Sequence, residues 1–364
     1  MAPSLREVPR ALGPALAALN LACPIEAGFT FVFDRAPDFF AWPDAAFDRY
    51  RYLGAFHGER LVGYALCGVT RGFTGAAATP YFYAGDLRVH PAARGAGLAM
   101  QLTLAHLDVL PEDCPAGFFL VKEGNRPAEE MVKPSRRVPR VVHRPLCRLE
   151  AQNALLLRLP APPGRARVRP AAAADLEPIA ALVRRALGAR LFGPAPDAAA
   201  LAAAAERGRG PVRTYVAERG GRLVGTVTAW DQDDLRRTRV LRYPLGAHLL
   251  RGAYALGRRV FPGAPALPPA GGALRAVTLT RLAVADRDPA VLADLLGAVA
   301  RDHRARGYHL IHLGFAHGDP LAAATRGYLT QRFCSRVWVA LPRGGGDPPL
   351  PAGARDPYLD LAII

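Results

Sequence analysis

The residues best suited to chemistry lie in one stretch, Asp86 to Ala99, which has the pattern of a strand, a short loop and a helix. Gly95 and Gly97 follow Arg94 where the helix would begin. The first turn of a helix has backbone N–H groups without intrahelical partners, and the helix dipole places positive charge there. Glycine has no Cβ, so a phosphate can approach this backbone closely. The stretch therefore predicts a site for a phosphorylated cofactor.

Glycine-rich turns between a strand and a helix occur in several phosphate-binding folds, so the surrounding pattern must discriminate. Here an antiparallel hairpin over residues 53–66 precedes the turn, and the turn lacks a Gly-Lys-Ser/Thr ending. No acidic ribose-binding residue follows about twenty positions later, as a dinucleotide fold would require. Leu87-x-Val89-x-Pro91 followed by Arg94-x-x-Gly97-x-Ala99 resembles the cofactor motif of the GNAT N-acyltransferase superfamily.

The resemblance implies that the chain uses acetyl-CoA or another acyl-CoA as co-substrate and needs no metal. Backbone amides of residues 94–99 would hold the CoA diphosphate, and the strand at 87–89 would pair with the pantetheine amides. A backbone N–H near Val89 would polarise the thioester carbonyl. The cofactor-binding residues implied in this way are Leu87, Arg88, Val89, Arg94, Gly95, Ala96, Gly97, Leu98, Ala99 and Asn125.

The proton carriers are less sharply indicated. Asn125 begins a segment that looks like the superfamily's Asn-x-x-Ala, but Val132 stands where many relatives have a tyrosine that protonates the leaving thiolate. An acceptor ammonium must lose a proton before attack, and Asp86 is the nearest acidic candidate for the base. Asp86 could equally hold neighbouring loop amides. Tyr83 is the second catalytic candidate; with Tyr81, on the same strand face, it would line the acceptor site or pack in the core.

The same pattern occurs twice in the chain. Leu61-Val62-Gly63 and Leu223-Val224-Gly225 each follow a glycine turn, and each copy continues into a strand, a long helix and another strand. The fold class we predict is α+β, with two tandem GNAT-like domains, each a mixed, mostly antiparallel sheet flanked by helices. In the second copy, residues 285–290 contain no glycine and two aspartates, which would repel a diphosphate. We therefore interpret the second copy as degenerate.

The domain limits follow from the repeat and from a Pro-rich seam. We place the GNAT acyltransferase domain at residues 1–159, a linker at 160–166 and the degenerate domain at 167–345. A tail at 346–364 has an alternating pattern that allows an edge strand. An insertion at 242–273, with a helix over 246–260, would be a lid, an acyl-chain cover or packing between the domains, and we favour the last.

The bulk composition fits two globular domains. A chain of 364 residues exceeds what one core usually serves. The net charge of +16 could attract nucleic acid, but nearly all of it is arginine, which fits GC-rich codon usage, and we expect no nucleic-acid partner. No apolar run reaches the roughly 18 residues of a membrane span. The scattered cysteines predict reduced thiols in a cytoplasmic protein. They are Cys23, Cys67, Cys114, Cys147 and Cys334.

The leading hypothesis is an N-acyltransferase that moves an acetyl or longer acyl group from CoA to an amine by direct attack. One alternative is a fatty-acyl transferase whose donor is a long-chain acyl-CoA or an acyl carrier protein. Another is a non-catalytic acyl-CoA sensor or scaffold. The acceptor would be an amine-bearing small molecule or a peptide, in a pocket formed by loops around residues 34–52 and by the second domain. An aminoacyl-tRNA substrate fits less well, because such transferases have little use for a CoA diphosphate site.

Overall fold

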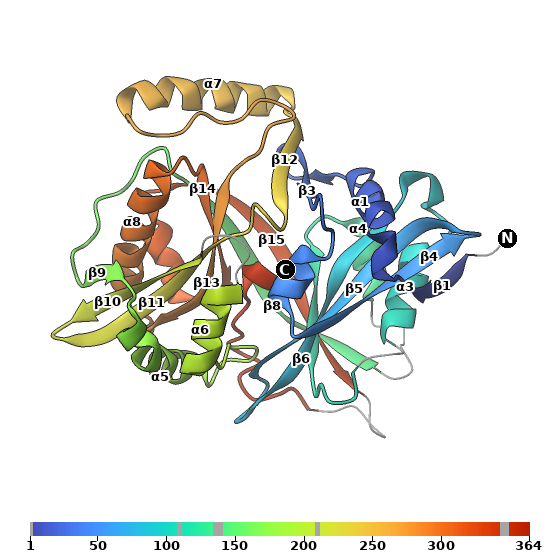
Figure 1. The fold of residues 1–364 in the computed structure, drawn as a ribbon, viewed down its shortest axis with the longest axis horizontal. Helices are drawn as coiled ribbons and strands as arrows, with labels where there is room; N and C mark the ends of the chain where they lie inside the picture. The colour runs from blue at the N-terminus through green and yellow to red at the C-terminus, as the bar shows by residue number, and fades with distance from the viewer. Residues whose placement is uncertain (1–2, 108–110, 134–140, 208–211, 343–348) are drawn as a thin grey trace.

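The computed structural model describes residues 3–107, 111–133, 141–207, 212–342 and 349–364. Two α+β units lie side by side and share one 12-stranded sheet, while a 3-stranded sheet lies at their junction (Figure 1). The order of the large sheet is β1-β4-β5-β6-β7-β15-β8-β14-β13-β11-β10-β9, and that of the small sheet is β12-β3-β2.

The element bounds of the first half, through β8, are as follows. The strands are β1 (Ser4–Glu7), β2 (Ile25–Glu26), β3 (Thr30–Asp34), β4 (Arg49–His57), β5 (Arg60–Phe73), β6 (Ala78–Val89), β7 (Gly117–Lys122) and β8 (Val141–Leu155). The α-helices are α1 (Gly13–Leu21), α2 (Ala41–Ala46), α3 (Leu98–Leu107) and α4 (Arg126–Met131).

The second half has the following bounds. The strands are β9 (Arg167–Pro170), β10 (Val212–Arg219), β11 (Arg222–Asp231), β12 (Arg237–Arg242), β13 (Ala276–Val284), β14 (Leu310–Ala316) and β15 (Leu329–Pro342). The α-helices are α5 (Leu176–Leu187), α6 (Ala198–Arg207), α7 (Leu245–Val260) and α8 (Pro289–Ala305).

The repeated pattern in the sequence corresponds to a repeated unit in the fold. The hairpins β4–β5 and β10–β11 are antiparallel, and glycines in left-handed conformation form both turns. The next strand of each unit, β6 or β13, leads to a long helix, α3 or α8. The helix leads to a strand that pairs parallel with its predecessor, β7 with β6 and β14 with β13. The prediction of two tandem GNAT-like α+β units with mixed sheets is confirmed.

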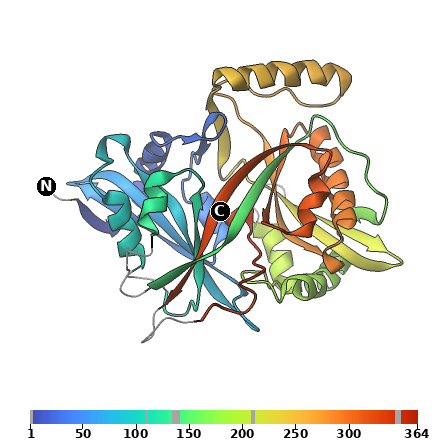
Figure 2. The same cartoon turned by 180° about the vertical axis from the view of Figure 1, so that it is seen from behind.

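Each unit borrows a strand from the other half of the sequence. β15 pairs antiparallel with β7, and β8 pairs antiparallel with β14. β8 and β15 also pair with each other over nearly their whole length, so the two long strands cross from one unit to the other (Figure 2). The limits 1–159 and 167–345 stay a prediction about the sequence, and the limit between 345 and 346 lies outside the described residues. The sheets join the units into one body.

The C-terminal tail lies at the centre of the molecule (Figure 1). Its alternating pattern allowed an edge strand, but the described tail ends in a short 3-10 helix, Leu361–Ile363, with all three side chains buried. These side chains belong to a core cluster that also contains Trp42, Phe118 and Phe192. The indole of Trp42 donates a hydrogen bond to the carbonyl of Ala362, 3.2 Å away. Apolar burial against both units, rather than strand pairing, therefore fixes the tail.

The insertion forms the helix that the sequence predicts, as α7. Strand β12, which ends at Arg242, pairs antiparallel with β3 of the first unit and so connects the units. The favoured interpretation of the insertion as packing between the domains is wrong for the helix itself, because α7 lies on the periphery in both views (Figures 1 and 2). Only Tyr254 of this helix is buried. Among the described helices, none is long and apolar enough to cross a membrane.

Candidate active site

An opening between β6 and β7 is the central feature of the first unit. Their parallel ladder covers only three pairs, from Phe82–Gly117 to Ala84–Phe119. Beyond Ala84, β6 still pairs with β5, but the register of the pairing shifts at Asp86. The φ of Asp86 is +49°. A β-bulge of this kind bends the strand and redirects its side chains. The two strands therefore diverge, and we call the opening bordered by residues 85–89 the first split.

Backbone N–H groups of β6 face the first split. The amide of His90 donates to the carbonyl of Val62 in β5, at 2.9 Å. Alternate residues of a strand direct their backbone groups to opposite neighbours, so Leu87 and Val89 direct theirs away from β5. The ladder to β7 has already ended there. This is the arrangement that pairing with pantetheine amides and polarisation of a carbonyl require.

The glycine turn at the start of α3, residues 94–99, lies where the sequence predicts a phosphate site, and we call it the anion cradle. Gly95 and Gly97 have φ of +88° and +72°, a conformation that glycine adopts without strain. A Cβ built on either glycine would meet no atom within 4 Å, so the backbone is open on this side. Residues 94–97 are exposed, whereas Leu98 is buried and anchors the helix. The Arg94 side chain folds back to donate to the carbonyl of Val89, at 3.2 Å, which places its positive charge beside the first split.

Asn125 lies at the start of α4, which follows β7. Its side-chain oxygen accepts a hydrogen bond from the Ala128 amide, at 3.4 Å, and caps the helix. Val132, where the family pattern has a tyrosine, ends this helix, and its carbonyl lies 3.2 Å from Nε2 of His143. His143 comes from β8 and contacts the ring of Phe119. Sequence reasoning missed His143, because the residues around it in the sequence do not show beside which strand β8 lies, and so do not place His143 near Val132 and Phe119.

Asp86 is held in a buried ion pair. Its carboxylate accepts from Arg35, at 2.8 Å, and from the hydroxyl of Tyr52, at 3.4 Å, and it lies 3.6 Å from Arg88. The side chains of Arg35 and Asp86 are only 2% and 6% exposed. The Arg35 guanidinium also lies over the rings of Phe39 and Trp42, each 4.7 Å away. Sequence reasoning missed Arg35, which lies in a loop with no motif to mark it. A carboxylate engaged in this way can hold the bulge, and its use as a base remains a prediction.

Tyr83 is buried beside the rings of Phe47 and Phe118. Its ring stacks on Phe47, with centroids 6.3 Å apart, and its hydroxyl lies over Gly85, where a Cβ would collide with it. Burial raises the pKa of Tyr83 to about 12, so the hydroxyl stays protonated near neutral pH. In that state Tyr83 can donate a proton or a hydrogen bond. Its catalytic role likewise remains a prediction.

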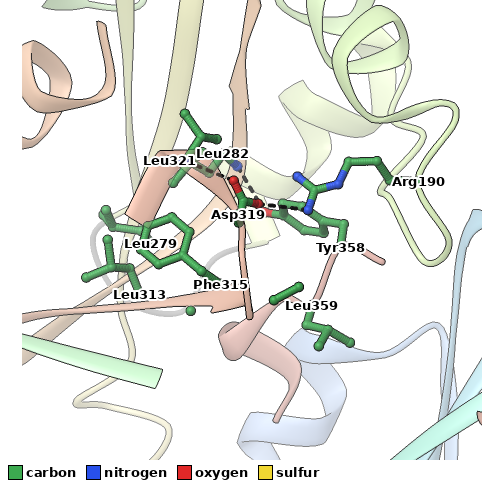
Figure 3. Close-up of a pocket in the computed structure, with 11 residues that line it drawn as sticks. Arg190, Leu279, Leu282, Leu313, Phe315, Asp319, Leu321, Tyr358 and Leu359 are labelled. Atoms are coloured by element: carbon green, nitrogen blue, oxygen red, sulfur yellow. Dashed lines mark hydrogen bonds and ion pairs between the residues drawn. The ribbon is translucent and has the colours of Figure 1, made fainter. Parts of the chain in front are cut away.

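The second unit has an equivalent split, but its own tail fills it. The ladder between β13 and β14 also covers three pairs, and Arg281 has a φ of +49°, like Asp86. Here the amide of Leu282 donates to the hydroxyl of Tyr358, at 3.0 Å. Figure 3 shows Tyr358 and Leu359 entering this opening. The cavity that is left measures about 20 Å³, room for about one water and far too little for a pantetheine arm.

The position of the anion cradle is also closed in the second unit. The carboxylate of Asp288 caps α8 by accepting from the amide of Ala290, at 2.9 Å. Arg287 next to it forms ion pairs with Asp319 and Asp356, at 3.0 and 2.9 Å. A side-chain carboxylate thus occupies the place that an external anion would take. These contacts agree with the interpretation of the second unit as degenerate.

Comparison with known proteins agrees with this architecture. The profile of the acetyltransferase (GNAT) family matches residues 17–133. No curated protein sequence matches the chain significantly. The structure of Saccharomyces cerevisiae N-myristoyltransferase with bound myristoyl-CoA is similar, with a TM-score of 0.58 and 12% identity over 94% of this chain and 83% of that one.

A GCN5-related N-acetyltransferase from Anabaena variabilis has a TM-score of 0.52 and 8% identity, over 93% of this chain and 72% of that one. At such identities the likeness shows a shared fold, which in both cases extends over both units. The family profile, in contrast, falls on the unit that contains the open split and the anion cradle. Residues 17–133 of this chain therefore match the acetyltransferase (GNAT) family, and the chain as a whole shares its fold with the N-acetyltransferase and the N-myristoyltransferase.

Proposed function

We propose that this protein is an N-acyltransferase that moves an acyl group from acyl-CoA to an amine, with the donor bound only in the first unit. The observation that carries the proposal is the contrast between the two units. The first has an open glycine turn beside a split whose residues 85–89 are half-exposed, whereas in the second an aspartate and a tyrosine fill the equivalent places. The CoA diphosphate would bind the amides of residues 95–98, with Arg94 beside it. The pantetheine arm would then lie between β6 and β7.

The chemistry follows from this placement. The amine nitrogen attacks the thioester carbonyl, the C–S bond breaks, and the CoA thiolate leaves. The backbone N–H of Val89, which faces the first split, would stabilise the negative charge that develops on the carbonyl oxygen. The attacking nitrogen loses one proton and the thiolate gains one. Tyr83 is protonated at neutral pH and is our candidate donor, while Asp86 is the candidate acceptor.

The most direct test of the donor site compares two matched glycine variants. Gly97 and Gly221 have φ of +72° and +73°, and a Cβ on either meets no atom within 4 Å. Gly97→Glu and Gly221→Glu therefore introduce the same backbone strain and the same charge. We expect acyl-CoA to raise the melting temperature of the wild type and of Gly221→Glu but not of Gly97→Glu. Equal stabilisation of both variants would show that the anion cradle does not bind the cofactor.

A long-chain acyl donor is the second candidate. It is supported by the likeness to yeast N-myristoyltransferase, whose structures show bound myristoyl-CoA and whose fold covers both units of this chain at TM-scores of 0.58 and 0.59. Thermal shifts and thiol release should be compared for acetyl-, decanoyl- and palmitoyl-CoA and for an acyl carrier protein thioester. Faster release from the long acyl-CoA substrates selects this candidate, and faster release from acetyl-CoA rejects it.

A sensor that binds acyl-CoA without turnover would share the binding site but not the chemistry. The test is release of CoA thiol in the presence of amines, amino acids and short peptides with free N-termini, followed by mass spectrometry of the acceptor. An acyl-amide product establishes the transferase. Tight acyl-CoA binding, with no product from any acceptor class, would favour the sensor.

A further inference from the structure

The helix α7 exposes an unusual amount of apolar surface. Four side chains, Leu245, Leu249, Leu256 and Val260, are between 61% and 86% exposed, and we call them the apolar stripe. Leu250 follows Leu249 in the sequence and is 73% exposed, but it lies about 80° outside the stripe around the helix. Contiguous apolar surface of this kind marks an interaction site, whereas single exposed leucines do not.

The spacing of the stripe shows that it is one face of the helix. At 3.6 residues per turn, its four members fall within an arc of about 60°. Tyr254 projects from the opposite side of the helix and is buried with Leu157 and Ala264. The helix lies at the periphery of the molecule (Figures 1 and 2). Its Tyr254 side is held to the body, whereas the stripe is exposed.

The stretch of sequence that contains α7 carries only positive charge. Between Asp234 and Asp286 the sequence has nine arginines and no acidic residue. Three of these arginines, Arg251, Arg258 and Arg259, lie on α7, and none of them pairs with a carboxylate within the described parts of the chain. Arg251 lies over the ring of Tyr243 and Arg258 donates to a backbone carbonyl. Arg242, which precedes α7, lies 3.7 Å from Glu26.

These features argue against a second copy of the chain as the occupant. A helix of 16 residues is about 24 Å long, and with a width of about 10 Å it offers about 240 Å². A stable dimer interface needs roughly 800 Å² from each partner. Pairing two such helices would also bring their arginines together without acidic partners.

We propose that α7 binds in the plane of an anionic lipid surface, with the apolar stripe at the boundary of the acyl chains and Arg259, about 40° from the stripe around the helix, against lipid phosphates. A helix with a leucine face and no charged residue other than arginine fits the pattern of an interfacial helix. Such a helix lies about 5–10 Å into the headgroup region. The arginines supply the attraction to anionic lipid, and it weakens with salt. The proposal does not depend on the identity of the acyl donor or acceptor.

The experiment is vesicle flotation with the full chain, without substrates. The vesicles contain phosphatidylcholine alone or phosphatidylcholine with phosphatidylglycerol. We expect the wild type to float with the anionic vesicles, and much less at high salt or without phosphatidylglycerol. Leu249→Ser/Leu256→Ser should lower the bound-to-free ratio roughly tenfold or more. The matched control is Leu21→Ser/Leu350→Ser, which changes two exposed leucines outside α7 and should float like the wild type.

A second readout places the stripe in the lipid. Leu249→Trp should show a blue-shifted emission with anionic vesicles and quenching by brominated acyl chains. Circular dichroism verifies that each variant is folded. Flotation that is equal for Leu249→Ser/Leu256→Ser and for the control would overturn the proposal. So would a failure of the wild type to bind vesicles, including the case in which the same leucines instead mediate self-association in sedimentation experiments.

Discussion

At the scale of single residues, the backbone conformation of the glycine turn could be predicted but the network around Asp86 could not. Gly95 and Gly97 have the positive φ that their place in the motif implies, because the local backbone alone determines that conformation. The partner of Asp86 is Arg35, 51 residues away and brought close only by the tertiary fold. Sequence spacing carries no information about such a pair.

Asp86→Asn separates the structural and the chemical role of this residue. Removing one partner of a buried ion pair leaves the other charge uncompensated, so we expect a loss of about 3–5 kcal/mol in the free energy of unfolding, measured by urea denaturation. Arg35→Met/Asp86→Asn should recover part of that loss. If Asp86→Asn keeps the wild-type stability while the turnover number falls by orders of magnitude, Asp86 is the base rather than an anchor.

Asp233 should make stability depend on pH. Burial, and then the charge of Asp231, raise the pKa of Asp233 to about 7. Asp233 therefore binds a proton more tightly in the folded state than in the unfolded state, and this difference stabilises the fold. The stabilisation is complete at acidic pH and is lost as the pH rises from about 4 to about 7. Asp233→Asn should stabilise the protein relative to the wild type by about 1–3 kcal/mol more at pH 8 than at pH 4, in denaturation curves at both pH values. A difference that does not vary with pH contradicts this assignment.

At the scale of elements, the strands and helices of the repeat could be predicted because hydrophobic periodicity is local. The hairpins and the helices α3, α7 and α8 lie where the sequence places them. The tail could not be predicted, because an alternating apolar segment fits a sheet edge or a buried crevice equally well. The tail enters the split of the second unit, and the sequence does not show that no other segment fills this split.

Tyr358→Phe tests how the tail closes the second split. The variant removes the acceptor for the amide of Leu282, and a buried N–H without a partner costs about 1–3 kcal/mol. We expect that loss in the unfolding free energy, with the affinity for acyl-CoA unchanged. Weaker acyl-CoA binding by this variant would mean that the second unit takes part in cofactor binding.

At the scale of the whole molecule, the exchange of β8 and β15 couples two units that the sequence presents as a simple tandem. Two internal copies predict two sheets, but they do not show which copy completes which sheet. One core cluster also contains residues of both units, among them Trp42 and Phe192, together with the tail. The stability of each unit should therefore depend on the other.

Calorimetry tests this coupling directly. We expect the full chain to unfold in a single transition whose calorimetric and van't Hoff enthalpies agree, because separation of the units breaks the ladders that β8 and β15 form. Acyl-CoA should shift the whole transition upward. Two resolved transitions, of which acyl-CoA moves only one, would show that the units are independent.

The central claim is that one unit of the pair binds acyl-CoA and the other is closed, and isothermal titration calorimetry of the full chain measures this most directly. The account predicts one acyl-CoA per chain, abolished by Gly97→Glu and retained by Gly221→Glu. A stoichiometry of two, or one site that persists in Gly97→Glu, would contradict it.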